Sequence, residues 1–121
     1  MNNVELGRLA EDFAVSCLEK GGIRVLERNY RLRGAEIDIV AEEGQTLVFT
    51  EVKYRSSAVR GTPAAAVDGR KQKKICSAAL HYVGTRGLTH RPVRFDVIEV
   101  TGGPGALKAR RIRNAFDFCG Y

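Results

Sequence analysis

Apolar and polar residues recur along the chain with two different periods, and these periods predict its helices and strands. Apolar side chains three or four positions apart are typical of one face of a helix, whereas alternation at every second position is typical of a strand. The helical pattern occupies residues 4–20 and 70–84. The alternating pattern predicts four strands, over residues 23–32, 36–41, 46–54 and 93–100.

The remaining segments predict loops and two short elements near the end of the chain. Residues 55–69 are polar and contain Gly and Pro, which indicates a mobile loop with a first helical turn from Pro63. Residues 107–113 suggest a short fifth strand. Asn114 is a candidate N-cap for a final short helix over residues 115–119.

The order of these elements, αβββαβ(β)α, predicts an α/β fold in one domain, residues 1–121. A chain of 121 residues is long enough to bury a core of its own. The helix between the third and fourth strands permits a parallel crossover connection, whereas the first three strands are joined by short turns. We therefore expect a sandwich in which helices flank a central mixed β-sheet.

Four charged residues interrupt the strands that should build the core: Glu36, Asp38, Glu51 and Lys53. If residues 43–44 form a two-residue turn, Asp38 lies diagonal to Glu51, and a four-residue turn places the two directly opposite each other. Either register gathers all four charged residues on one face, because side chains alternate along a strand. A three-residue turn without a bulge would separate them.

The predicted charged face carries three carboxylates against one ammonium, and such an arrangement needs a further cation. Mg²⁺ suits it, because Mg²⁺ prefers oxygen ligands and is held by one or two carboxylates. Asp38 and Glu51 are the candidate ligands, together with the backbone carbonyl of Val52. Lys53 would position the attacking water or stabilise the transition state of phosphodiester hydrolysis. The competing interpretation is a solvent-exposed face with a cross-strand Glu–Lys pair.

The opposite face of the same hairpin is predicted to be apolar and to face the core. It carries Ile37, Ile39, Val48, Thr50 and Val52.

The charge of the chain has two interpretations, an ordinary solvated basic surface or a surface that binds a polyanionic partner. The formal net charge is +6, and the basic residues are clustered rather than evenly spread. No apolar run is long enough to span a membrane and the N-terminus lacks the apolar segment of a secretory signal, so we expect a cytoplasmic location. The three cysteines show no zinc-ligand spacing, and Cys17 and Cys76 are expected on the apolar faces of the two helices.

The acidic and basic residues of this hairpin also carry a family resemblance. Asp38, Glu51 and Lys53 form a D-x₁₂-E-x-K pattern across adjacent strands, which resembles the core of the PD-(D/E)XK nuclease superfamily. More closely, the chain resembles the YraN-like family of small bacterial proteins. The matching stretches are "GRLAEDFA", "RNYRLRGAEIDIVAEEGQTLVFTEVKYR", "AVDGRKQKKI", "VRFDVIEV" and "IRNAFD".

The resemblance implies a restriction-endonuclease-like fold and a Mg²⁺- or Mn²⁺-dependent nuclease, similar to archaeal Holliday-junction resolvases. It assigns Asp38 and Glu51 as metal ligands and Lys53 as the motif lysine. It adds Glu11 from the first helix as a catalytic candidate. Gln72 and Lys73 match a polar pair that follows the motif in some relatives. Ile37 replaces the proline of the motif, and Ala35 stands where the family often has glycine.

The expected partner is DNA, including branched or junction DNA, and a homodimer is expected only by analogy with resolvases. Tyr54 and Arg55 are open to two interpretations, phosphate contact or packing at a strand edge. The alternatives to a nuclease are a non-catalytic nucleic-acid-binding module with the same fold and a scaffold that binds an acidic protein. The candidate nucleic-acid contacts are Arg31, Arg33, Tyr54, Arg55, Arg70, Lys71, Lys73 and Lys74.

Overall fold

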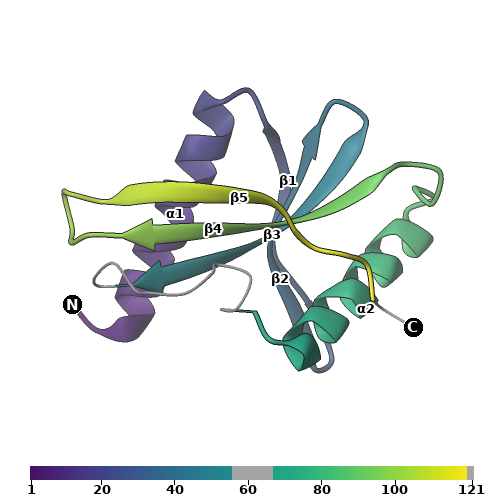
Figure 1. Cartoon of the computed structure of the whole chain (residues 1–121), viewed down its shortest axis with the longest axis horizontal. Helices are drawn as coiled ribbons and strands as arrows, with labels where there is room; N and C mark the ends of the chain where they lie inside the picture. Colours follow the sequence, from purple (N-terminus) through teal and green to yellow (C-terminus); the bar gives the residue numbers. More distant parts are fainter. Residues whose placement is uncertain (56–66, 120–121) are drawn as a thin grey trace.

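A five-stranded mixed sheet with a helix packed on each face forms the fold (Figure 1). It is seen in a computed structural model that describes residues 1–55 and 67–119. The strands follow one another across the sheet in chain order, and β3 and β4 are parallel while the other neighbours are antiparallel. The predicted α/β fold with a mixed sheet is therefore confirmed. The elements are α1 (Asn3–Lys20), β1 (Arg24–Leu32), β2 (Ala35–Glu43), β3 (Thr46–Arg55), α2 (Gly69–Thr85), β4 (Val93–Thr101) and β5 (Lys108–Phe116).

Both helices begin at side-chain caps. The side chain of Asn2 accepts the backbone N–H of Glu5 at 2.8 Å, and the side chain of Asp68 accepts the backbone N–H of Lys71 at 2.9 Å. Such caps satisfy N–H groups that have no partner inside the helix. The cap at Asp68 also fixes where the first turn of α2 begins, which matters for the site below. The predicted helical turn at Pro63 lies outside the described residues.

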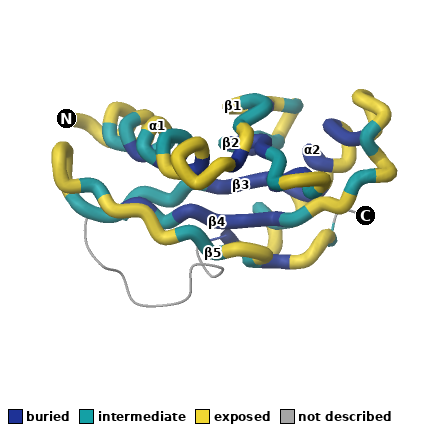
Figure 2. Tube along the Cα trace, turned by 90° about the horizontal axis from the view of Figure 1, so that it is seen from above, coloured by how far each residue is buried: buried dark blue, intermediate teal, exposed yellow. Residues whose placement is uncertain are grey.

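Two apolar clusters fill the space between the sheet and its helices. Ala10, Ala14 and Leu18 of α1 pack with alternate residues of β2, β3 and β4, such as Val48. The intervening residues of the same strands pack against α2, so the two helices cover opposite faces. Figure 2 shows the result, with the central strands buried beneath both helices. Neither helix of the described residues is long and apolar enough to cross a membrane.

The expectation of a final helix over residues 115–119 is wrong. Strand β5 continues to Phe116, which pairs with Phe95 and stacks on its ring at a centroid distance of 5.1 Å. Asn114 does not cap a helix. It adopts φ 53°, a left-handed conformation that Asn tolerates, and its backbone N–H donates to the carboxylate of Asp96 at 2.9 Å. This irregular position lets the strand continue past the point where the sequence pattern ends.

Cys17 does not lie on the buried face of α1, as the sequence pattern suggested. The buried line of this helix runs through Ala10, Ala14 and Leu18, and Cys17 beside it is exposed. Leu80 of α2 is 49% exposed, although helical spacing groups it with Cys76 and Val83 on one face. Cys76, by contrast, is buried as predicted.

The β2–β3 hairpin has the register predicted for a four-residue turn, which brings Asp38 opposite Glu51, and not the register of a turn at residues 43–44. Glu43 pairs with Thr46 and Ile39 with Thr50, so the loop is Gly44–Gln45. Gly44 has φ 60°, and a positive φ at the first loop position is the feature of a type II′ hairpin turn, which glycine accepts without strain. This register directs Asp38 toward Glu51.

Candidate functional site

Asp38 and Glu51 lie together where β2 and β3 separate. The backbone N–H of Val52 donates to Asp38 Oδ2 at 2.8 Å, and the backbone N–H of Asp38 donates to Glu51 Oε1 at 3.3 Å. The regular pairing of these strands ends just before, at the pair of Ile39 and Thr50. Each carboxylate thus accepts a hydrogen bond from a main-chain N–H that would otherwise bond to a neighbouring strand.

The strand on the other side of Asp38 is irregular as well. In β1 the pairs with β2 step over Asn29, which has φ 53°. Ile37 packs against α2, together with Val40, whereas Ile39 packs against α1. The prediction that Ile37 and Ile39 share a face is therefore wrong, because the alternation of side chains is broken at Asp38.

Burial shapes the electrostatics of the two carboxyl groups. Removal from water raises the pKa of Glu51 to about 7, and the negative charge of Asp38 raises it further while Lys71 opposes the shift. Removal from water also raises the pKa of Asp38 to about 6, against the hydrogen bond from Val52. Buried carboxylates this close favour a cation beside them, because their ionised forms repel each other.

Two lysines supply positive charge at this point. Lys71 Nζ of α2 lies 3.4 Å from Glu51 Oε2. Lys53 lies next to Lys71, and burial together with the neighbouring Lys71 lowers the pKa of Lys53. Burial likewise acts to lower the pKa of Lys71, but the interactions of Lys71 with Lys53 and Glu51 raise this pKa overall. Asp38, Glu51, Lys53 and Lys71 thus form one interacting group, which we call the acidic–lysine cluster.

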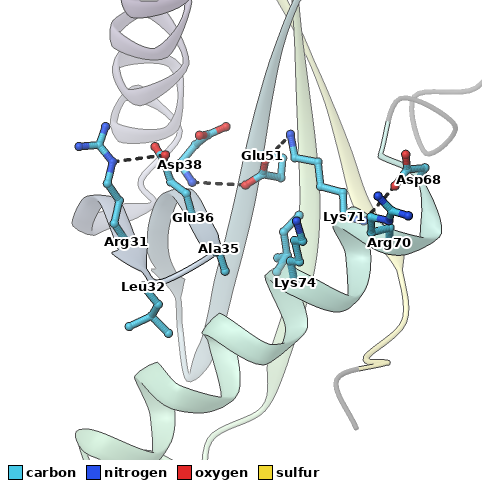
Figure 3. Close-up of a pocket in the computed structure, with 12 residues that line it drawn as sticks. Arg31, Leu32, Ala35, Glu36, Asp38, Glu51, Asp68, Arg70, Lys71 and Lys74 are labelled. Atoms are coloured by element: carbon cyan, nitrogen blue, oxygen red, sulfur yellow. Dashed lines mark hydrogen bonds and ion pairs between the residues drawn. The ribbon is translucent and has the colours of Figure 1, made fainter.

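The cluster opens into a pocket with a volume of about 570 Å³. Figure 3 shows its arrangement: Glu51 projects from β3 between Asp38 and Lys71, and the first turns of α2 form the opposite wall. The lining carries four basic and four acidic residues. It comprises Arg31, Leu32, Gly34, Ala35, Glu36, Asp38, Glu51, Asp68, Arg70, Lys71, Lys74 and Ile75.

The predicted nucleic-acid contacts divide into two groups. Arg31, Arg70, Lys71 and Lys74 line the pocket, whereas Arg33, Tyr54, Arg55 and Lys73 do not. The side chains of Tyr54 and Arg55 are engaged elsewhere. The Tyr54 hydroxyl donates to the Gly102 carbonyl, and Arg55 forms an ion pair with Glu99 at 3.1 Å.

The remaining catalytic candidates lie beside the pocket rather than in it. Glu11 accepts hydrogen bonds from Arg28 at 3.1 Å and Asn29 at 2.9 Å, and its charge raises the pKa of Asp38 from a distance. Gln72 donates to the Val67 carbonyl at 2.7 Å and so fastens the start of α2. Of the predicted catalytic residues, Asp38, Glu51 and Lys53 therefore belong to the acidic–lysine cluster.

Sequence reasoning named Lys71 as a phosphate contact but missed its ion pair with Glu51. The available signal was Asp68, a good N-cap residue three positions earlier. It places Lys71 in the first turn of the helix but gives no direction toward β3, because residues 56–66 separate the two elements.

The capacity for a metal rests on two carboxylates. In residues 1–55 and 67–119, no group of three or more His, Cys, Asp or Glu side chains converges to hold a metal ion. Asp38 and Glu51 nevertheless suit Mg²⁺ or Mn²⁺, because Mg²⁺ is commonly bound by one or two carboxylates, water and a substrate phosphate. Val52 lies directly beside them, since its N–H donates to Asp38.

Comparisons with known proteins place the chain in one family. Residues 10–100 match the family described as "Uncharacterised protein family UPF0102", which is the YraN-like family expected from the sequence. The chain is 52% identical over 112 residues to a UPF0102 protein of Desulforapulum autotrophicum, with 93% of each chain covered. It is 44% identical over 117 residues to a UPF0102 protein of Geobacter sulfurreducens, with 96% of this chain and 91% of the relative covered.

Proposed function

Because the chain belongs to the uncharacterised protein family UPF0102, we propose its function from its own site: a divalent-cation-dependent nuclease that hydrolyses phosphodiester bonds of DNA, including branched or junction DNA. One observation carries this proposal. The half-buried Asp38 and the buried Glu51 meet Lys53 and Lys71 at a pocket that is lined by both basic and acidic side chains. Carboxylates suit a metal and lysines suit a phosphate, so the cluster matches both parts of such a reaction.

Asp38 and Glu51 would hold Mg²⁺ or Mn²⁺, with the Val52 carbonyl as a further ligand. When bound, the ion supplies a Lewis acid and lowers the pKa of a coordinated water. Lys53 lies beside both carboxylates, where its amine can hydrogen-bond the attacking water or a phosphate oxygen. Burial of Glu51 excludes bulk water from this side of the cluster and strengthens each of these electrostatic contacts.

The cations around the pocket would bind the nucleic-acid backbone. Arg31, Arg70 and Lys74 line the pocket from two sides of the acidic–lysine cluster. A net charge of +6 attracts a polyanion, and each neutralised phosphate releases counterions. We retain the cytoplasm and a homodimer as predictions.

A cleavage assay tests the proposal. Single-stranded, duplex, flap and four-way-junction DNA are incubated with the protein in Mg²⁺, Mn²⁺ or EDTA. We expect cleavage that needs the divalent cation and that falls at least about a hundredfold in Asp38→Asn, Glu51→Gln and Lys53→Met. Glu36→Gln is a matched control, because Glu36 lines the same pocket but pairs with Arg31. Cleavage that persists in the first three variants would come from a contaminant and sink the assignment.

The second candidate is a non-catalytic nucleic-acid-binding module. It is favoured by the ion pair of Lys71 with Glu51, which neutralises the acidic pair without a metal. This alternative predicts DNA binding that weakens with salt and does not respond to Mn²⁺. A scaffold for an acidic protein is the third possibility, and it predicts no DNA binding at moderate salt.

A further inference from the structure

Lys71 contacts the same carboxylate that the proposed cation requires. We propose, on the basis of the proposed function, that Lys71 holds Glu51 while no divalent cation is bound and turns to a backbone phosphate of the nucleic acid when the cation takes its place. Lys71 would thus be a phosphate-binding residue whose availability depends on the cation.

The four carboxylate oxygens of the site are not equivalent. Val52 donates to Asp38 Oδ2, and Asp38 donates to Glu51 Oε1, so these two oxygens face main-chain N–H groups. Among the hydrogen bonds of the described residues, Asp38 Oδ1 and Glu51 Oε2 receive no backbone donor. They are the oxygens available to a cation, and Lys71 Nζ lies 3.4 Å from Glu51 Oε2. The ammonium and the cation therefore compete for one oxygen atom.

The two partners of this ion pair differ in freedom. The side chain of Glu51 is 3% exposed and that of Lys71 is 42% exposed. The main chain of Lys71 is fixed by the Asp68 cap at the start of α2, but its long side chain reaches Glu51 across the pocket. Displacement by a cation would therefore move the lysine side chain and leave the carboxylate where it is.

The surroundings of Lys71 indicate the chemistry of its second partner. Lys53 lies next to it, and two neighbouring ammonium groups repel each other once Glu51 is occupied by a metal. Arg70 and Lys74 of the same helix and Arg31 of β1 line the pocket. A phosphodiester oxygen relieves this accumulation of positive charge. The cation and the nucleic acid should then strengthen each other's binding, as reciprocal coupling requires.

Calorimetric titration with MnCl₂ tests the competition, using the full chain and three variants. Lys71→Met removes the competing ammonium, and we expect it to bind Mn²⁺ roughly threefold to tenfold more tightly than the wild type. Lys74→Met is the matched control, because it removes a cation from the same pocket without touching Glu51. It should bind Mn²⁺ within about twofold of the wild type, since exposed charges act weakly at a distance. Glu51→Gln should lose binding.

The outcomes separate this inference from the proposed function. If Glu51→Gln binds Mn²⁺ like the wild type, the metal site is elsewhere and both proposals fail. If Glu51→Gln loses binding but Lys71→Met gains no more affinity than Lys74→Met, the metal site at Glu51 is supported. The proposal that Lys71 competes with the cation for Glu51 is then wrong. Binding by Lys71→Met where the wild type is too weak to measure would support the exchange.

A second titration tests the phosphate contact. A fluorescein-labelled four-way DNA junction is bound to the protein with Ca²⁺ or with EDTA, and fluorescence anisotropy gives the affinity. We expect Ca²⁺ to strengthen wild-type binding severalfold, and we expect this gain to shrink in Lys71→Met but not in Lys74→Met. An equal gain in DNA affinity with Ca²⁺ in wild type and Lys71→Met would show that Lys71 does not bind a DNA phosphate when the cation is present.

Discussion

The backbone N–H of Val52 donates to Asp38 Oδ2 at 2.8 Å, in place of a hydrogen bond between the two strands. The same exchange occurs one step away, where the N–H of Asp38 donates to Glu51 Oε1. One oxygen of each carboxylate is therefore held by the main chain of the sheet, while the Lys71 side chain contacts the second oxygen of Glu51. The choice of substitution at Asp38 can therefore remove its negative charge with or without removing the hydrogen-bond acceptor for Val52.

Asp38→Asn should preserve the sheet while it removes the charge, because an amide oxygen can still accept the N–H of Val52. Asp38→Ala leaves that part-buried N–H without its acceptor, and this should cost roughly 1–3 kcal/mol relative to Asp38→Asn. Urea denaturation of both variants at pH 8 measures the difference. Equal unfolding free energies would mean that the Val52 contact does not organise the strands.

The raised pKa of Glu51 predicts a dependence of stability on pH. Burial moves this pKa from 4.5 to about 7, so the folded protein binds the proton more tightly than the unfolded chain. The resulting stabilisation is fully present below about pH 4.5 and is lost as the pH rises to about 7. Glu51→Gln lacks this loss, so its unfolding free energy relative to wild type should increase by roughly 1–3 kcal/mol between these pH values.

Parallel urea titrations of wild type and Glu51→Gln across this range give the difference directly, because the contributions of distant carboxyl groups cancel. A difference that stays constant with pH, or that decreases toward pH 7, would contradict the raised pKa.

The largest loss of stability is expected far from the site, at Asp96. This fully buried carboxylate accepts two hydrogen bonds from Arg94, at 2.8 and 3.0 Å, one from Arg111 at 3.2 Å, and the N–H of Asn114. Asp96→Ala leaves these donors unpaired and should cost about 3–5 kcal/mol. Thermal and urea denaturation measure the loss.

Glu36→Ala is the control for this prediction. The ion pair of Glu36 with Arg31 is exposed, so its removal should change the unfolding free energy by less than about 1 kcal/mol. A comparable loss in both variants would show that the Asp96 network is no more important than a surface pair.

The three cysteines should differ in reactivity. Burial raises the pKa of Cys76 to about 11, and its sulfur lies 3.5 Å from that of Cys119. Cys17 is exposed. With a chromogenic disulfide reagent at pH 8, Cys76 should react at least about a hundredfold more slowly than Cys17, because the thiolate is the nucleophile. Cys17→Ser should remove the fast phase. A fast phase that remains in Cys17→Ser but disappears in Cys76→Ser would contradict this order.

The parts of the fold that sequence could predict are those set by local pattern. The period of apolar residues located α1, α2 and the first four strands, and the parallel crossover followed from the helix between β3 and β4. The final helix was wrong because Asn114 is both a good cap and a residue that tolerates φ 53°, and pairing with β4 selected the second role. Long-range pairing of this kind leaves no local signal.

The site shows the same division. Alternation along the strands predicts Asp38, Glu51 and Lys53 on one face of the hairpin. The sequence left two registers open, that of a two-residue turn at residues 43–44 and that of a four-residue turn. The structure has the second register, although its loop is only Gly44–Gln45. The contact of Lys71 with Glu51 depends on how α2 packs against β2, which no sequence spacing encodes.

Anomalous diffraction from crystals soaked in MnCl₂ tests most directly whether Asp38 and Glu51 bind a divalent cation. If Asp38 and Glu51 hold the cation, a manganese peak will lie within coordination distance of both carboxylates and will be lost in Glu51→Gln. A soaked crystal with manganese bound only elsewhere, or with Lys71 still paired to Glu51 at saturating Mn²⁺, would contradict it.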